Sequence, residues 1–164
     1  MDDKEFLKVY DMYSDAIFRH CFFRLRDRDE AKDLAQETFL RVWEYLSRGR
    51  RVENMKAFLY KVANNRIIDV LRKSGRVSSL DQLAEDGFDP KDEKPDNNLD
   101  KLDGAIALGK TAELPDIYKQ VILLRFVSDL TIREIAEISG ESQNVVSVRL
   151  HRGLRRLKKL CKLD

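Results

Sequence analysis

Residues 131–160, TIREIAEISGESQNVVSVRLHRGLRRLKKL, decide the fold of this 164-residue chain. Apolar residues recur every three or four positions on both sides of Gly140, which predicts two amphipathic helices joined by a tight turn. Thr131 and Glu134 have the spacing of a capping box at the start of the first helix, and Ser142 is a typical N-cap for the second. A short helix, a turn containing glycine and a longer basic helix together make a helix-turn-helix pattern.

The first 75 residues predict three further amphipathic helices. Between Phe6 and Leu25 the apolar positions are three or four residues apart, and two more stripes with this spacing follow along the chain. Asn54 is a suitable N-cap for the third of these helices. Because helices of this length with short connections pack as a bundle, we predict an all-α protein with two small domains. These are an N-terminal helical bundle, residues 1–75, and a C-terminal helix-turn-helix domain, residues 112–164.

The segment between the two predicted domains has a different composition. Residues 76–111 are rich in Asp, Asn, Ser and Gly and hold two of the three prolines, which predicts a flexible acidic linker with a short helix near its end. Residues 1–73 carry 16 basic and 13 acidic side chains (net +3), residues 74–114 carry 5 and 10 (net −5), and residues 115–164 carry 10 and 6 (net +4). Two basic blocks around an acidic middle predict an anionic partner for both ends of the chain.

Composition and motifs argue against several classes of protein. No apolar run approaches the roughly 20 residues of a membrane-spanning helix, and the first ten residues lack the pattern of a signal peptide. Cys21 and Cys161 are isolated, as is usual in the reducing cytoplasm, so we predict a cytoplasmic protein in which both are packing residues. The sequence has no metal-spaced His/Cys cluster, phosphate-binding glycine loop or Ser-His-Asp arrangement. We therefore predict no enzyme activity, cofactor, metal, small-molecule substrate or membrane insertion.

The last predicted helix has the residues of a nucleic-acid reader. Between Ser142 and Leu163 there are seven Lys or Arg and no acidic residue, whereas a merely solvated helix face, the alternative, normally mixes both signs. Its N-terminal half carries short polar side chains that can meet base edges in a major groove: Gln143, Asn144, Ser147 and His151. Its arginines can make bidentate bonds to guanine or contact phosphate: Arg149, Arg152 and Arg155. These seven residues are the predicted duplex DNA site.

Three stretches, taken in order, resemble the conserved regions of bacterial sigma factors. EAKDLAQETFLRVWEYL (30–46) is similar to their second region, AFLYKVANNRIIDVLRK (57–73) to the promoter-melting segment after it, and residues 114–160 to their fourth region. Two domains without a long central domain resemble the extracytoplasmic-function (ECF) group. The resemblance covers nearly everything outside the linker. Three motifs in this order and spacing are far more specific than a helix-turn-helix alone.

The resemblance implies roles for the second and third helices. In the family the second helix docks on the clamp helices of the largest RNA polymerase subunit, which implies this core polymerase-binding set: Asp33, Gln36, Glu37, Leu40 and Arg41. The third helix would capture the melted −10 strand, since amides can read an extruded base and cations can hold the backbone. Its residues are Tyr60, Lys61, Asn64, Asn65, Arg66, Arg72 and Lys73. Asn65 matches the family position nearest the flipped base.

The resemblance also assigns the last helix to the −35 duplex, with contact positions at Ser147, Arg149, His151 and Arg152. The sequence departs from the family pattern at three positions of this helix. Val145 stands where threonine is usual, Ser147 where a basic residue is frequent, and Gly153 where alanine is typical. Glycine costs up to about 1 kcal/mol in an exposed helix. These departures affect the expected −35 preference and leave the expected fold unchanged.

The chain is thus identified as a member of the ECF sigma factors, which bind core RNA polymerase and direct promoter-specific initiation without catalysis. One alternative is a helix-turn-helix regulator that binds duplex DNA independently of core polymerase. A second is a helical interaction protein whose basic blocks bind acidic protein partners. The family also implies an anti-sigma factor as an inhibitory partner, for which the sequence carries no direct signature.

Overall fold

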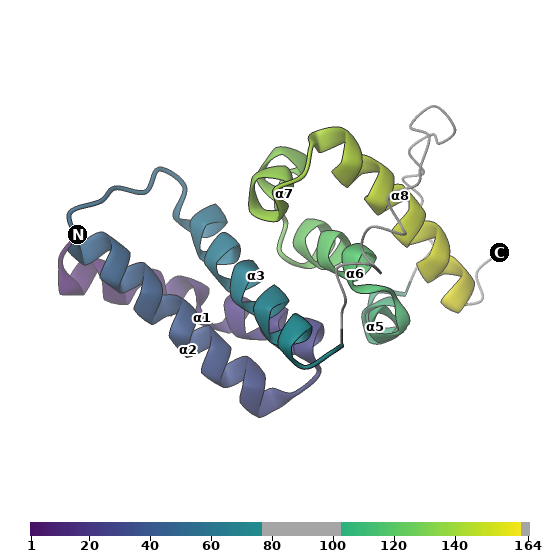
Figure 1. The fold of residues 1–164 in the computed structure, drawn as a ribbon, viewed down its shortest axis with the longest axis horizontal. Coiled ribbons are helices and arrows are strands. Elements are labelled where there is room, and N and C mark those ends of the chain that lie inside the picture. Colours follow the sequence, from purple (N-terminus) through teal and green to yellow (C-terminus); the bar gives the residue numbers. More distant parts are fainter. Residues whose placement is uncertain (77–102, 162–164) are drawn as a thin grey trace. The chain divides into compact units, whose positions relative to one another are not determined.

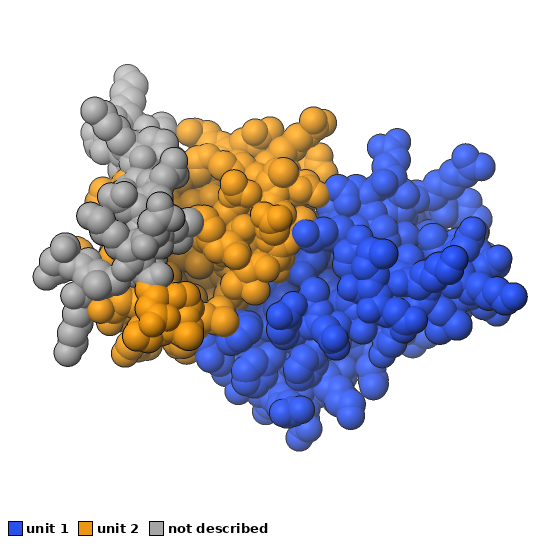
Figure 2. Space-filling view, turned by 180° about the vertical axis from the view of Figure 1, so that it is seen from behind, with its two compact units in different colours: residues 1–76 blue, residues 77–164 orange. Residues whose placement is uncertain are grey.

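The computed structural model describes residues 1–76 and 103–161, and every regular element in these two ranges is helical. The chain divides into two units, residues 1–76 (blue in Figure 2) and residues 77–164 (orange). The predicted all-α class with two helical domains is confirmed. Most of the predicted linker lies outside the described residues, as do Leu99 and Leu102, where we expected a short helix to begin.

The first unit is a bundle of three helices that all pack on one another: α1 (Asp3–Leu25), α2 (Arg28–Ser47) and α3 (Met55–Lys73) (Figure 1). Each helix begins after a side chain that accepts a backbone N–H from its first turn: Asp2, Asp27 and Asn54. Between α1 and α2 the chain reverses at Arg26, whose φ is +57°. The apolar sides meet in a core that includes Ile17, Cys21, Phe39, Val42, Leu59, Ala63 and Ile67.

The second unit contains six helical segments in its described part: α5 (Gly104–Lys110), η2 (Thr111–Glu113), α6 (Asp116–Ile122), η3 (Leu123–Val127), α7 (Ile132–Ser139) and α8 (Gln143–Leu160). α6 continues directly into η3, which has the wider turn of a π-helix. The side chains of Val121, Leu124, Leu130, Ile135 and Val146 are almost fully buried and form the centre of this unit.

The local signals that predicted the helix-turn-helix have the expected geometry. The Thr131 hydroxyl accepts the Glu134 N–H at 3.1 Å, and the Glu134 carboxylate accepts the Thr131 N–H at 3.0 Å. Gly140 ends α7 with a φ of +74°, which glycine adopts without strain. The Ser142 hydroxyl then accepts the Val145 N–H at 3.1 Å at the start of α8. These contacts set the angle at which α8 leaves α7, because they fix the backbone on both sides of the turn.

Gly153 is a packing residue, which corrects its interpretation as a weak point of an exposed helix. It is buried where α8 contacts α6. A Cβ atom at this position would lie 2.8 Å from Ile122 Cδ1 and 3.1 Å from Tyr118 Cβ. Both distances are shorter than ordinary van der Waals contact. Glycine therefore allows the two helices to approach more closely than alanine would.

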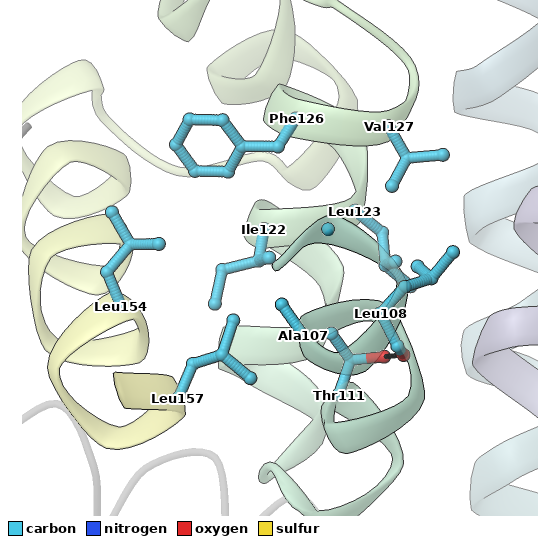
Figure 3. Close-up of a pocket in the computed structure, with 10 residues that line it drawn as sticks. Ala107, Leu108, Thr111, Ile122, Leu123, Phe126, Val127, Leu154 and Leu157 are labelled. Carbon is cyan, nitrogen blue, oxygen red and sulfur yellow. Dashed lines mark hydrogen bonds between the residues drawn. The ribbon is translucent and has the colours of Figure 1, made fainter. Parts of the chain in front are cut away.

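An apolar pocket of about 180 Å³ lies between α5, η3 and α8 (Figure 3). Its walls include Ala107, Leu108, Phe126, Leu154 and Leu157. The hydroxyl of Thr111, also in the lining, donates a hydrogen bond to the Leu108 carbonyl at 2.6 Å. The pocket therefore belongs to the packing of α5 on the rest of this unit and presents no cluster of polar groups.

Candidate nucleic-acid interfaces

The outward side of α8 brings together most of the residues predicted to read duplex DNA. Asn144, Ser147, His151 and Arg155 follow at intervals of three and four residues and so share one face of the helix. Arg155 Nη2 lies 3.1 Å from His151 Nε2 on this face. Gln143 is exposed beside it. The opposite side of α8 carries the buried residues Val146, Leu150, Gly153 and Leu157, so α8 has one polar, partly basic face and one packing face.

Arg149 does not lie on the polar face of α8, contrary to our expectation. It follows Ser147 by two residues, which turns its side chain by about 200° around the helix. The residue is only 7% exposed, and its Nη2 lies 3.3 Å from Glu141 Oε1 in the turn before α8. The structure therefore supports a role for Arg149 in holding the turn, because a base cannot reach a buried guanidinium without rearrangement.

The predicted −10 residues of α3 divide into exposed and buried groups. Lys61, Asn65 and Arg72 are exposed at intervals of four and seven residues, so they form one stripe, with Lys73 exposed beside it. Arg66 is half-buried on the side of α3 that faces α2. The stripe combines an amide with cations on one surface.

Tyr60 and Asn64 lie inside the bundle, which corrects their assignment to the DNA surface. Asn64 is 0% exposed, and its Oδ1 accepts a hydrogen bond of 2.8 Å from Nη1 of buried Arg24 on α1. The Tyr60 ring packs edge-on against His20, with 5.4 Å between ring centroids. The sequence analysis did not identify Arg24 as a buried partner of α3. Its position four residues after His20, on the side of α1 that faces the core, was the available signal. These four residues connect α1 to α3 behind the exposed stripe.

Burial favours the neutral forms of His20 and Cys21, near the C-terminal end of α1. It lowers the pKa of His20 to about 3, with a further lowering by the nearby charge of Arg24. It raises the pKa of the Cys21 thiol to about 12, against smaller opposing effects of Arg24 and a backbone hydrogen bond. Within the described part of the chain, neither ring nitrogen of His20 has a hydrogen-bond partner. A neutral buried thiol is a poor nucleophile, which agrees with the packing role expected for Cys21.

The five residues predicted to bind polymerase share the outward face of α2. Asp33, Gln36, Glu37, Leu40 and Arg41 have the spacing of a single helical face, and Leu40 is 57% exposed. Buried Leu34, Thr38 and Val42 lie on the other side. A carboxylate, an amide and an exposed leucine give this face both polar and apolar contact groups. Such a mixture is typical of a protein–protein interface.

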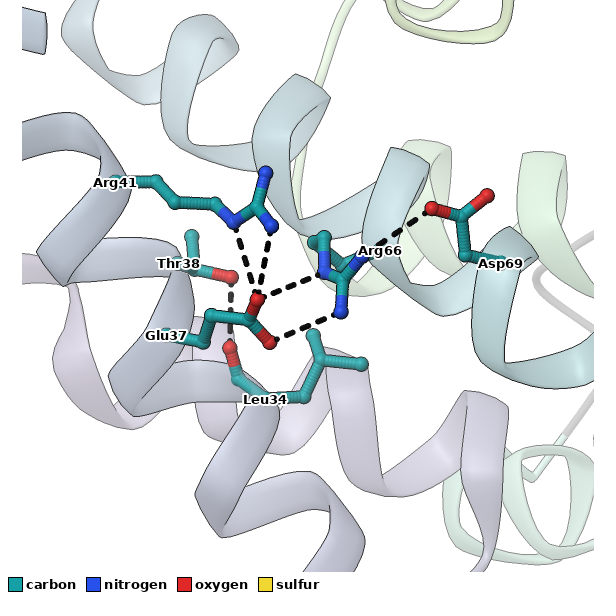
Figure 4. A network of polar contacts seen from close by, with 6 residues as sticks. All are labelled: Leu34, Glu37, Thr38, Arg41, Arg66 and Asp69. Carbon is teal, nitrogen blue, oxygen red and sulfur yellow. Dashed lines mark hydrogen bonds and ion pairs between the residues drawn. The ribbon is translucent and has the colours of Figure 1, made fainter.

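A network of charged groups connects this face of α2 with α3 (Figure 4). Glu37 Oε1 lies 3.0 Å from Arg41 Nη2 and 3.1 Å from Arg66 Nε, and Glu37 Oε2 accepts a hydrogen bond of 3.3 Å from Arg66 Nη2. On its other side Arg66 Nη1 contacts Asp69 Oδ2 at 3.2 Å. The structure thus joins a residue of the predicted polymerase set to a residue of the predicted −10 set. Helical periodicity gives no signal for a contact across 29 residues.

No group of three or more His, Cys, Asp or Glu side chains in residues 1–76 and 103–161 could hold a metal ion. Over the same ranges no helix combines the length and the apolar character that a membrane crossing requires.

Together, a three-helix bundle and a helix-turn-helix unit with a polar, basic helix face are the features of a DNA-binding protein. Comparison with known families agrees with this class. The model of Sigma-70 region 2 matches residues 9–77, and the model of Sigma-70, region 4 matches residues 110–157.

Curated relatives narrow the class to one family. The chain is 30% identical over 171 residues to the ECF RNA polymerase sigma factor SigW of Bacillus subtilis, covering 96% of this chain and 89% of SigW. It is 33% identical over 144 residues to RNA polymerase sigma factor SigV of the same organism, covering 86% and 81%. The chain belongs to the family of ECF RNA polymerase sigma factors. The resemblance inferred from the sequence is confirmed, and it is favoured over a regulator that acts without polymerase.

A solved structure shows the same fold. The sigma factor RpoE from Bartonella quintana, crystallised in complex with the anti-sigma factor NepR, superposes with a TM-score of 0.74 at 22% identity. The match covers 98% of this chain and 99% of RpoE. At this level of identity the match supports the arrangement of helices and leaves the individual contact residues to the geometry described above.

Proposed function

We propose that this sigma factor binds core RNA polymerase through the outward face of α2 and promoter DNA through α3 and α8. The observation that carries the proposal is the pair of outward stripes on α3 and α8, each opposite a buried side of its helix. Each stripe combines groups that hydrogen-bond bases with groups that neutralise phosphate. The first unit would then serve the −10 element and the second the −35 element.

On α3 we assign strand capture to Lys61, Asn65 and Arg72. The Asn65 amide offers one acceptor and two donors to the edge of an unpaired base, and Lys61 and Arg72 would bind the backbone on either side of it. Lys61 lies one helical turn before Asn65, about 6 Å along the axis, and Arg72 lies about 10 Å beyond it. Tyr60 and Asn64 would support this surface from within, because both are buried.

On α8 we assign the −35 duplex to the stripe of Asn144, Ser147, His151 and Arg155, with Gln143 and Arg152 at its edges. These side chains lie in the N-terminal two-thirds of the helix, the part that helix-turn-helix proteins insert into the major groove. Arg155 is able to bond guanine bidentately, and the short polar groups before it suit direct contact with base edges.

We further propose that the protein works without catalysis or a cofactor, in the cytoplasm, where it would meet polymerase. Because a sigma factor is a dissociable subunit of RNA polymerase, an inhibitor could bind the protein while it is free of polymerase. RpoE from Bartonella quintana was crystallised with the anti-sigma factor NepR, and we carry over to this chain an anti-sigma partner of its own. The domain boundaries at residues 75 and 112 belong to the same proposal.

Transcription in vitro with core polymerase and a promoter library tests the proposal. The full chain should direct initiation at a defined set of promoters, and failure at all of them would overturn it. Asn65→Ala should lower open-complex formation by about 5- to 100-fold while core binding is retained. Lys8→Ala changes an exposed residue of α1 outside the assigned surfaces and is the matched control for Lys61→Ala. Equal effects of the two lysine changes would contradict the assignment of the α3 stripe.

A further inference from the structure

The ion pair between Glu37 and Arg66 joins the two surfaces that we assign to different partners. Three nitrogens of Arg66 each lie within 3.3 Å of a carboxylate oxygen: Nε and Nη2 contact Glu37, and Nη1 contacts Asp69. The Glu37 carboxylate meets the guanidinium side-on through both of its oxygens (Figure 4). Only Nη2 donates a hydrogen bond to Glu37, whereas the Nε contact is an ion pair without hydrogen-bond geometry, so Glu37 holds Arg66 less tightly than a bidentate pair would.

In this arrangement the positive charge of Arg66 is largely neutralised within the protein. The network holds two guanidinium groups, Arg41 and Arg66, and two carboxylates, Glu37 and Asp69, so its formal charge is zero. A phosphate near α3 would have to compete with Glu37 for Arg66. Because the side chains of Arg66 and Glu37 are 22% and 36% exposed, water screens the pair and the exchange is accessible.

Arg41 reduces the energetic cost to Glu37 of losing its contact with Arg66. Both Arg41 Nε and Nη2 contact the same Glu37 oxygen, at 3.1 and 3.0 Å. When Arg66 leaves, Glu37 keeps this second cation and is not left as an unpaired charge. Asp69 has a different place in the network, because it lies on α3 three residues after Arg66 and makes a single contact with it.

We propose that Glu37 is a positioning residue that withholds Arg66 from the promoter strand until a polymerase residue engages Glu37. Polymerase on α2 then competes with Arg66 for Glu37, and the strand on α3 competes with Glu37 for Arg66. Whichever binds first breaks the pair, so the second binds more tightly, and the effect is reciprocal. This inference rests on the proposed function, because it uses the α2 and α3 surfaces assigned above.

Strand binding by the full chain without polymerase gives the direct test. The probe is a fluorescent single-stranded oligodeoxynucleotide with the non-template −10 sequence of a promoter that the protein transcribes. Glu37→Gln should bind it about two- to fivefold more tightly than the native chain, because the amide holds Arg66 less strongly. The plot of log K against log salt should steepen by about 0.7, as expected for one added phosphate contact on a single strand. A residue with only a structural role would not change this slope.

Three further comparisons identify the cause. Glu44→Gln removes the same charge from an exposed position two turns further along the outward face of α2, about 10 Å from Glu37 along the helix axis, and it should have a smaller effect than Glu37→Gln. In an Arg66→Gln background, Glu37→Gln should change neither the affinity nor the salt slope. With assembled holoenzyme, native and Glu37→Gln proteins should bind the strand with similar affinity.

Three results would overturn the inference: weaker strand binding by Glu37→Gln, equal effects of the Glu37 and Glu44 changes, or a Glu37→Gln effect that persists without Arg66. These results are distinct from failure of the proposed function. In that case the native protein would neither bind the strand nor initiate transcription, and no variant could be compared with it.

Discussion

Replacing Gly153 by alanine is expected to destabilise the second unit, although alanine is the better helix former. The new Cβ would lie 2.8 Å from Ile122 Cδ1 and 3.1 Å from Tyr118 Cβ on α6. Ile122 Cδ1 is the far end of a flexible side chain and can rotate away. Tyr118 Cβ is attached directly to the backbone, so α6 and α8 must separate by a few tenths of an ångström.

Two opposing contributions determine the size of this effect. Alanine gains about 1 kcal/mol over glycine in a helix interior. Overpacking of a well-packed contact costs about 1–3 kcal/mol, which we place near 2 kcal/mol here because one of the two close atoms cannot move independently. The net loss is about 1 kcal/mol, or roughly 4–8 °C in the unfolding midpoint of a unit of this size. Gly153→Val adds two further methyl groups at the same contact and should lose about 3 kcal/mol.

Urea and thermal denaturation of the full chain, followed by circular dichroism, would measure these changes. Gly109→Ala is the matched control. It makes the same substitution in α5, where a Cβ would meet no atom within 4 Å, and it should stabilise by up to about 1 kcal/mol. If Gly153→Ala stabilises the protein as much as Gly109→Ala does, close approach of the two helices is not the reason for glycine at position 153.

Three further predictions concern stability. Lowering the pH from 7.5 to 5 should reduce the unfolding free energy by about 2 kcal/mol through His20, because His20 takes up a proton below pH 6.5 in the unfolded state and only near pH 3 in the folded state. The variant His20→Leu should therefore show a flatter plot of unfolding free energy against pH over this range. Arg149→Ala should lower the unfolding free energy by about 2 kcal/mol through loss of its packing and its ion pair with Glu141. If the variant instead has unchanged stability and weaker DNA binding, Arg149 contacts DNA directly, as the sequence first indicated. Thr131→Ala should cost about 1 kcal/mol by removing one half of the capping box with Glu134, and an unchanged denaturation curve would contradict this.

The features that sequence predicted correctly depend on residues close together in the chain. The caps at Asn54, Thr131 and Ser142 involve side chains and N–H groups three residues apart, so their spacing alone indicates them. Periodicity likewise identified the apolar sides of the helices. These two signals were enough to predict the fold class and most of the α8 face.

The errors came from residues at the border between the two sides of a helix. Tyr60, Asn64 and Arg149 are polar or amphipathic, and periodicity places them next to exposed positions. Whether such a residue is buried depends on what the neighbouring element offers. Asn64 is buried because Arg24 donates a hydrogen bond to it, and Arg149 because Glu141 pairs with it. Such partners become visible only when the helices are placed in three dimensions.

The buried contacts between α1 and α3 have a consequence for how promoter preference could change during evolution. His20 meets Tyr60 and Arg24 meets Asn64, so a step of four residues on one helix matches a step of four on the other. The two helices therefore run in the same direction, and these pairs fix their offset along the axis. A substitution at position 20 or 24 would move Asn65 relative to the rest of the bundle. If Asn65 contacts the strand as proposed, strand preference could be altered through side chains that are buried inside the bundle.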